Sequence, residues 1–165
     1  MKKITLIFAI FAVLLLTVSA GTEREYNAVE GMKAPYFEVT DGDDGISWSS
    51  DGKDGRFVIV NFWASGDASS RIAANRYDSY VKSVGEERIG LVSINIDENR
   101  RLFEEIVRHD GMNGESQFNV ETAQASYLVR MFDMSNGLKS FLIDPDGTIV
   151  AVDPATETIA ALASI

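Results

Sequence analysis

The chain has 165 residues, of which 45% are hydrophobic and 24% charged, with three prolines, one histidine and no cysteine. This length and apolar fraction predict one folded domain rather than a disordered or collagen-like chain. A sequence without cysteine excludes disulfides, thiolate nucleophiles, zinc–thiolate sites and iron–sulfur clusters. With His109 as the single imidazole, a multi-histidine metal site within one chain is excluded too. We therefore expect no metal and no cofactor.

The charge balance is acidic. Fifteen Lys and Arg residues against twenty-five Asp and Glu residues give a formal net charge of −10. The phosphates of nucleic acids and anionic membrane surfaces repel such a protein. We therefore expect neither as a partner, and solubility is the simpler reason for the acidity.

The first twenty residues have the pattern of an export signal. Lys2 and Lys3 precede an apolar run over 4–18, and Val18-Ser19-Ala20 offers small residues to a signal peptidase. The run is short for a bilayer span, which needs about 20 apolar residues. An uncleaved anchor is the alternative.

These features divide the chain into three parts. We expect a signal peptide over 1–20 with cleavage after Ala20, a polar leader over 21–33 and a single domain over 34–165. The mature protein is then periplasmic or secreted, and it has no membrane contact beyond the signal segment.

The region after the leader predicts two short strands and a longer one. The short strands, 37–39 and 46–48, flank an Asp- and Gly-rich turn. A calcium loop starting at Asp41 would need Glu at its twelfth position, which is Gly52. The run 57–63 is almost entirely β-branched or aromatic, which is typical of a strand covered on both faces.

The middle of the chain predicts two helices and a second buried strand. Apolar residues at helical spacing indicate a helix over 73–84, and 89–96 indicates a strand. Asp97 is suited to cap the next helix, whose apolar face includes Phe103 and Ile106. The segment 111–119 is expected to be irregular.

The last third predicts a helix, a hairpin and a short helix. Tyr127 and Leu128 lie on the apolar face of the first helix. Strands at 139–143 and 148–152 flank Asp144-Pro145-Asp146-Gly147, a strong tight-turn signal. The order of elements predicts an α/β fold with a central mixed sheet flanked by helices.

Three motifs carry a family resemblance: GMKAPYF at 31–37, VNFWAS at 60–65 and FLIDPDG at 141–147. Together with the helices between them, they resemble exported thioredoxin-like proteins, which belong with thiol–disulfide oxidoreductases and the peroxiredoxin-related superfamily. The resemblance covers residues 31–165 and implies a thioredoxin-like fold with an N-terminal β-hairpin. The family's chemistry lies in a Cys-x-x-Cys at a helix N-terminus, where the helix dipole lowers the pKa of the first thiol.

In this chain both cysteines of that motif are replaced. Asp67 falls on the first position and Ser70 on the second, while Gly66 replaces the usual aromatic residue. The family's cis-proline corresponds to Leu138. A cis bond without proline costs about 2.5–4 kcal/mol, so the Gly137–Leu138 bond is expected to be trans. The resemblance therefore carries no oxidoreductase activity over to this chain.

Asp67 has a structural and a functional interpretation. A carboxylate at a helix N-cap accepts N–H bonds and meets the positive end of the helix dipole, which is worth about 1 kcal/mol. In the functional interpretation, Trp63, Gly66, Asp67 and Leu138 form a surface that binds an extended peptide or a partner loop. For Trp63, packing in the core or at its rim is favoured over contact with a partner.

A catalytic role for Ser70 is not expected. A serine nucleophile needs a base within hydrogen-bond reach, and His109 ends a helix that we do not expect near Ser70. A metal site at Asp67 is not expected either, because one carboxylate supplies too few ligands.

The sequence thus predicts an exported, redox-inactive thioredoxin-like domain. We expect it to bind an envelope protein or peptide through the altered active-site surface. One alternative is a cysteine-free auxiliary member of the oxidoreductase family that acts in envelope thiol–disulfide metabolism. Another is a structural remnant without a specific partner.

Overall fold

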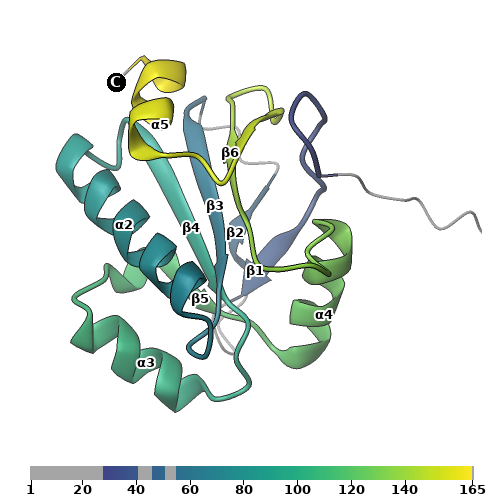
Figure 1. Cartoon of the computed structure of the whole chain (residues 1–165), viewed down its shortest axis with the longest axis vertical. Coiled ribbons are helices and arrows are strands. Elements are labelled where there is room, and N and C mark those ends of the chain that lie inside the picture. The colour runs from purple at the N-terminus through teal and green to yellow at the C-terminus, as the bar shows by residue number, and fades with distance from the viewer. Residues whose placement is uncertain (1–27, 41–45, 51–54, 165) are drawn as a thin grey trace, which may run out of the picture.

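The structure, a computed structural model, describes residues 28–40, 46–50 and 55–164 (Figure 1). Its centre is a mixed five-stranded sheet with the strand order β5-β4-β3-β6-β7. β3, β4 and β5 run parallel to one another, whereas β6 is antiparallel to both β3 and β7. The strands are β3 (Phe57–Trp63), β4 (Ile89–Asn95), β5 (Gln117–Asn119), β6 (Ser140–Ile143) and β7 (Ile149–Val152).

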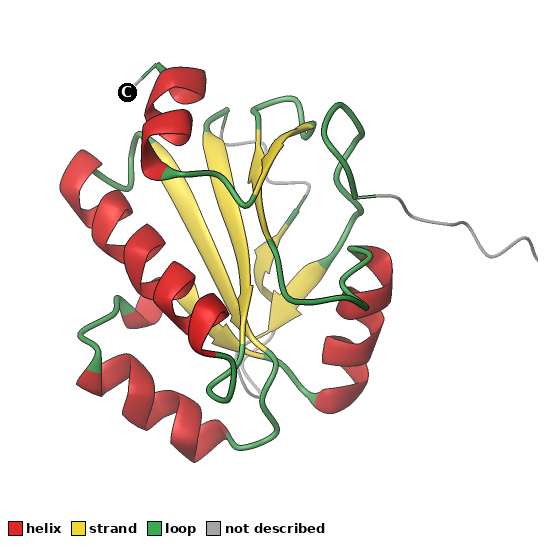
Figure 2. Cartoon of the chain, in the orientation of Figure 1, coloured by secondary structure: helices red, strands yellow, loops and turns green. Residues whose placement is uncertain are grey.

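Helices cover both faces of this sheet (Figure 2). One face packs against α2, α3 and α5, and the other packs against α4. The predicted α/β architecture with a mixed sheet flanked by helices is therefore confirmed. The helices are α2 (Ala68–Val84), α3 (Arg100–His109), α4 (Thr122–Met131) and α5 (Thr156–Ala163).

The central strand β3 is apolar because both of its faces are buried. Val60 and Phe62 pack on the α4 side, and neither is exposed to solvent. Ile59 and Trp63, which alternate with them, pack on the side of α2 and α3 and are equally buried. Each fully buried aliphatic or aromatic side chain contributes about 1.5–3 kcal/mol relative to an exposed one. The strand prediction for 57–63 is confirmed to the residue.

A buried polar row crosses the sheet at Asn61. Its amide Nδ2 donates to Ser93 Oγ on β4 at 3.1 Å, and its Oδ1 accepts from Ser140 Oγ on β6 at 2.9 Å. All three side chains are buried. Both ends of the Asn61 amide are therefore hydrogen-bonded, as buried polar groups generally are. The three side chains link β4, β3 and β6.

A two-stranded antiparallel sheet lies beside α4. It consists of β1 (Glu38–Thr40) and β2 (Ile46–Ser49). β1 is shifted by one residue from the predicted strand 37–39, and β2 extends one residue beyond the predicted 46–48. The predicted turn between them falls on 41–45, outside the described residues. Phe37 and Val39 belong to the main hydrophobic core. The two-stranded sheet is therefore packed against the rest of the domain.

The chain joins the domain earlier than predicted. Residues 28–33, which the sequence assigned to a polar leader, lie along the edge strand β7. Gly31 N–H donates to Ile149 O at 2.8 Å, and Ile149 N–H donates to Met32 O at 2.9 Å. Ala28 is 3% exposed within the core. This pairing joins residues more than a hundred positions apart, so local sequence pattern gave no signal of it.

The segment 111–119 is not irregular throughout, contrary to our expectation. It contains a short 3₁₀ helix over Gly114–Ser116 and the edge strand β5. A strand of three residues has too few positions to show an alternating pattern. It forms because Ser93–Asn95 of β4 supply its pairing partners.

The predicted hairpin near the C-terminus is confirmed. β6 and β7 pair antiparallel around the turn, where Asp144 Oδ1 accepts the N–H groups of Asp146 at 3.0 Å and Thr148 at 2.8 Å. Gly147 adopts φ +80°, which favours glycine. Over the part of the chain that is described, no helix is long and apolar enough to cross a bilayer.

Replacing Asn61 tests the polar row. We expect Asn61→Ala to lower the free energy of unfolding by about 1–3 kcal/mol, because two buried hydroxyl groups lose their partner. The measurement is urea unfolding followed by circular dichroism. Ser79→Ala on the exposed side of α2 is the control and should change stability by no more than about 0.5 kcal/mol. Equal effects of the two substitutions would contradict the role of the row.

Candidate functional site

Asp67 is the N-cap of α2, as the sequence predicts. Its carboxylate accepts the backbone N–H of Ser69 at 3.0 Å and that of Ser70 at 3.3 Å, and the Ser69 hydroxyl donates to it at 2.6 Å. The hydrogen bonds from the Ser69 hydroxyl and the Ser70 backbone hold the pKa of Asp67 below its ordinary value. A fixed negative charge therefore stands at the start of the helix.

Ser70 also stabilises the first turn of α2. Its side chain is 6% exposed. The hydroxyl donates to Asp67 O at 3.1 Å and accepts the N–H of Ala64 at 3.2 Å. Both bonds join the helix to the preceding loop, so Ser70 acts as part of the capping structure.

Asp97 anchors the loop before α2 from the neighbouring strand. Its Oδ2 accepts the N–H of Ser65 at 2.7 Å and the Asn95 amide at 2.8 Å. The predicted role of Asp97 as the cap of α3 is wrong. Asn99 caps that helix, accepting the N–H of Leu102 at 3.1 Å. Asp97 does not directly precede Arg100, the first residue of α3. It instead holds the loop between β3 and α2.

Trp63 does not belong to the surface that the sequence proposed for binding. Its side chain is 0% exposed and packs against Phe103 of α3, with the ring centroids 5.9 Å apart. The indole N–H has no hydrogen-bond partner among the described residues. Of the two predicted roles of Trp63, packing in the core is confirmed and the place in a binding surface is wrong, because α3 covers the end of β3.

Leu138 lies in the loop before β6 and is half-buried. Its side chain packs against the main core, so it offers a partner less apolar surface than the sequence suggested. The Gly137–Leu138 bond is trans, as expected, since the described residues contain no cis peptide bond. Phe62 N–H donates to Lys139 O at 3.1 Å, which places this loop beside the end of β3.

The end of α3 lies close to the start of α2, contrary to our expectation. Arg71 forms two hydrogen bonds with Asp110, from Nε and from a terminal nitrogen, both of 2.8 Å. The bond from Arg71, followed by a contact from His109, holds the pKa of Asp110 below its ordinary value. His109 Nδ1 lies 2.9 Å from Asp110 Oδ1, and its side chain is 84% exposed. Since Ser70 bonds to the backbone instead, this proximity creates no catalytic pair.

A groove of about 430 Å³ lies between these two helix ends. Ile72 forms part of it and is 67% exposed, the highest value among the large hydrophobic residues of the described chain. At Gly66 an added Cβ would meet no atom within 4 Å outside the adjacent residues, so the missing side chain leaves the groove open. The lining residues are Ser65, Gly66, Ala68, Arg71, Ile72, Asn75 and Asp110.

Of these seven residues the sequence pointed only to Gly66 as part of a site. The other six were missed: Ser65, Ala68, Arg71, Ile72, Asn75 and Asp110. One local signal was available for Ile72, because it lies outside the buried stripe that includes Ala74. Asp110 lines the groove only because α3 packs beside α2, and the residues around it in the sequence gave no sign of this contact.

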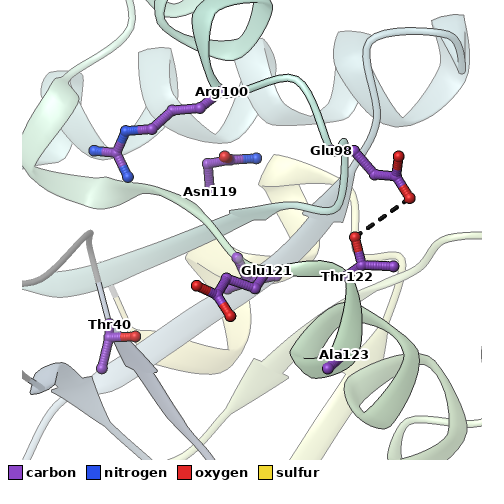
Figure 3. Close-up of a pocket in the computed structure, with 8 residues that line it drawn as sticks. Thr40, Glu98, Arg100, Asn119, Glu121, Thr122 and Ala123 are labelled. Atoms are coloured by element: carbon purple, nitrogen blue, oxygen red, sulfur yellow. Dashed lines mark hydrogen bonds between the residues drawn. The ribbon is translucent and has the colours of Figure 1, made fainter.

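A second cavity, of about 540 Å³, lies beyond the ends of β4 and β5 (Figure 3). Its polar side chains come from the starts of α3 and α4 and from the ends of β1 and β5. Asn119 of β5 donates to Asn95 Oδ1 and to Asp97 O, both at 2.8 Å. Thr122 donates to Glu98 at 3.3 Å, and Arg100 pairs with Glu104 at 3.0 Å. None of its lining residues belongs to the start of α2. The lining residues are Thr40, Glu98, Arg100, Asn119, Val120, Glu121, Thr122 and Ala123.

Acidic side chains do not gather into a metal centre in the described part of the molecule. Within it, no group of three or more His, Asp or Glu side chains is placed to hold an ion. Asp67 instead directs its carboxylate to the helix N-terminus.

Comparison with solved structures identifies the fold. A thioredoxin-like protein from Parabacteroides distasonis superposes with a TM-score of 0.73 and 29% identity, over 84% of this chain and 97% of that one. The chain has a thioredoxin-like fold. A comparison with protein-family models gives no match, and a comparison with curated proteins gives none either.

Other thioredoxin-like neighbours are bacterial oxidoreductases. A thiol:disulfide interchange protein from Bacteroides sp. has a TM-score of 0.70 and 18% identity, over 83% of this chain and 91% of that one. A thiol-disulfide oxidoreductase from Bacteroides fragilis has a TM-score of 0.65 and 20% identity, over 81% of this chain and 98% of that one. At such identities the likeness establishes the fold alone. This chain has the scaffold of these proteins but contains no cysteine.

Replacing Asp67 tests its capping role. We expect Asp67→Ala to lower the free energy of unfolding at pH 7 by about 1 kcal/mol, whereas Asp67→Asn retains most of the stability because Asn caps equally well. The folded pKa is depressed below the unfolded value of about 3.9, so the charged form stabilises the fold. That contribution is present above pH about 4 and is lost as the pH falls through the folded pKa.

The stability difference between wild type and Asp67→Ala should therefore shrink as the pH falls below about 4. Urea unfolding between pH 2.5 and 7 measures it. An Asp67→Ala protein as stable as wild type at pH 7 would contradict the assignment of the cap.

Proposed function

We propose that this protein is an exported, redox-inactive thioredoxin-like domain that binds another protein of the cell envelope at the start of α2. The binding surface consists of Gly66, Asp67 and the groove beside them, with Leu138 at the neighbouring loop. The N-terminal pattern of two lysines, an apolar run and Val18-Ser19-Ala20 supports export. The observation that carries the proposal is an open groove beside a charged helix cap, in a chain without any thiol.

Thiol chemistry needs a thiolate at the helix start and a second sulfur one turn later. Asp67 and Ser70 occupy the start of α2, and their side chains are engaged in capping bonds. Neither group can form a mixed disulfide. A helix N-terminus favours a negative charge. The Asp67 carboxylate supplies that charge but cannot take part in disulfide exchange.

The groove has features that suit protein binding. Its shape is concave, and Ile72 gives it an exposed aliphatic side chain that a partner could cover. Arg71 and Asp110 form a bidentate pair that links the two helix ends. A rigid surface of this kind binds with a smaller ordering cost than a flexible one.

Site-specific cross-linking in cells that make the protein tests the proposal. The photo-reactive residue p-benzoylphenylalanine is placed at the exposed position 68 in the groove, or at position 162 on α5 as a control. We expect a discrete adduct with an envelope protein from position 68 and none from position 162. Adding Ile72→Asp should abolish the adduct, whereas the matched exposed change Leu162→Asp should not.

Two results would overturn the proposal. One is identical adducts from both positions, and the other is no adduct from position 68 in protein shown to be folded and exported. Either result would favour a structural remnant. Reduction of insulin disulfides by the purified protein above a blank would instead support the auxiliary oxidoreductase.

A further inference from the structure

The chain is fixed on both sides of α3. Before the helix, Asp97 is held by the backbone of the loop that precedes α2. After the helix, the buried carboxylate of Asp78 on α2 accepts the N–H of Asn113 at 2.7 Å. Lys82, also on α2, donates to Gly111 O at 2.7 Å. α3 therefore lies between two segments that are anchored by contacts outside the helix itself.

The helix between these anchors is held by a small part of the core. Phe103 and Ile106 are its buried residues. They pack with Trp63, Ala74 and Met112 in the smallest of the three clusters of buried apolar residues in the described chain, whereas α4 packs into the largest. Elements with few buried apolar contacts open at a lower free energy than that of unfolding the whole protein. We therefore expect α3 to be held less firmly than the centre of the domain.

Two buried polar groups on the α3 side of the sheet lack hydrogen bonds. The indole N–H of Trp63 has no partner among the described residues, and neither has the side-chain amide of Gln117, which is 2% exposed. Phe118 packs in the core on the α4 side, so the adjacent Gln117 faces the side of α3, which contacts β5. Unpaired buried polar groups destabilise the closed arrangement, and movement of α3 away from the sheet would give them access to water.

The pair of Arg71 and Asp110 acts in the opposite direction. Asp110 follows the last residue of α3, and its carboxylate accepts two bonds of 2.8 Å from Arg71 in the first turn of α2. The Asp110 side chain is 10% exposed. Bidentate pairs of arginine and carboxylate are among the stronger polar interactions in proteins. This pair therefore stabilises the closed position of α3.

We propose that α3 opens and closes as a unit of its own, between Asp97 and Gly111, while the rest of the domain stays folded. The Arg71–Asp110 pair determines how often it opens. The closed state is the one in the structure, and it is the more populated. Opening removes Asp110 from the groove and uncovers Trp63 at the end of β3. α3 thereby controls whether the binding groove is complete, a consequence that rests on the proposed function.

Amide hydrogen exchange in the ¹⁵N-labelled protein, followed by NMR, tests the inference. After correction for sequence, we expect the slowest amides of α3 to exchange at least a hundred times faster than those of the central strand β3. Ile149→Val removes a methyl group from the large cluster, to which α3 does not belong. It should accelerate the slowest amides of β3 at least twofold and leave those of α3 unchanged, because α3 opens while that cluster is intact.

Two further variants test the role of the ion pair. We expect Asp110→Ala to accelerate exchange of the α3 amides at least fivefold, since the open state has already lost the pair and only the closed state is destabilised. Glu105→Gln, on the exposed side of the same helix, is the matched control and should change exchange by less than twofold.

Four results would overturn the inference. In the wild type, the result is equal protection of α3 and β3. In the variants, the results are an acceleration of α3 in Ile149→Val as large as that of β3, unchanged exchange of α3 in Asp110→Ala, and an equal effect of Glu105→Gln and Asp110→Ala.

Thiol labelling provides an independent check on the surface that is uncovered. The chain contains no cysteine, so a single introduced thiol can be followed alone. Ala74→Cys places a thiol in the cluster beneath α3, and Ala125→Cys places one on α4 in the large cluster, both at buried positions. Relative to the rates in concentrated urea, we expect the Ala74→Cys variant to react with dithiobis(nitrobenzoate) at least ten times faster. Equal or slower labelling of this variant would contradict the opening of α3.

These experiments use the free protein, so their outcome is independent of any partner. If they fail while the adduct from position 68 forms, the proposed function stands and the control by α3 is rejected. If they succeed and the adduct is absent, α3 opens as proposed and the groove is rejected as a binding site.

Discussion

The hydrogen bonds from the first turn of α2 to the Asp67 carboxylate determine what this surface can do. The N–H groups of Ser69 and Ser70 point to Asp67, and a helix N-terminus favours a negative charge whatever its source. A thiolate would satisfy the same groups and could then react. A carboxylate satisfies them as well, but it cannot take part in disulfide exchange, which needs a thiolate.

The surroundings of the cap keep it in place from several directions. Ser70 joins the helix to the preceding loop, and Asp97 holds that loop through Ser65. Trp63, buried against α3, fixes the end of β3 beneath it. These contacts position Asp67 and the groove on a rigid base. A rigid site of this kind is suited to recognising a partner by its charge and shape.

Features determined by local sequence were predicted well. The run 57–63 forms β3 because its two faces are both buried, and the Asp144–Gly147 turn directs the hairpin that follows. The cap at Asp67 was also predicted, because capping needs only a carboxylate and the N–H groups two and three residues later. The pattern that predicts each of these features lies in a few consecutive residues, so it can be recognised in a single sequence.

Features determined by packing between distant segments were missed. β5 exists because β4 offers it an edge, and residues 28–33 pack along β7 through backbone bonds that any sequence can form. Trp63 is buried and Asp110 meets Arg71 because α3 lies where it does. The groove depends on that same placement, and so the sequence identified Gly66 and Asp67 without the residues that complete the site.

The most direct measurement of the central claim is the mapping of amide chemical shifts in the ¹⁵N-labelled protein while the cross-linked partner, once identified, is added. We expect the largest shifts at residues 65–72 and at Asp110, around the start of α2. Shifts centred on Glu98 and Glu121, at the polar cavity of Figure 3, would contradict it. In that case the surface at the start of α2 would not be the one that binds.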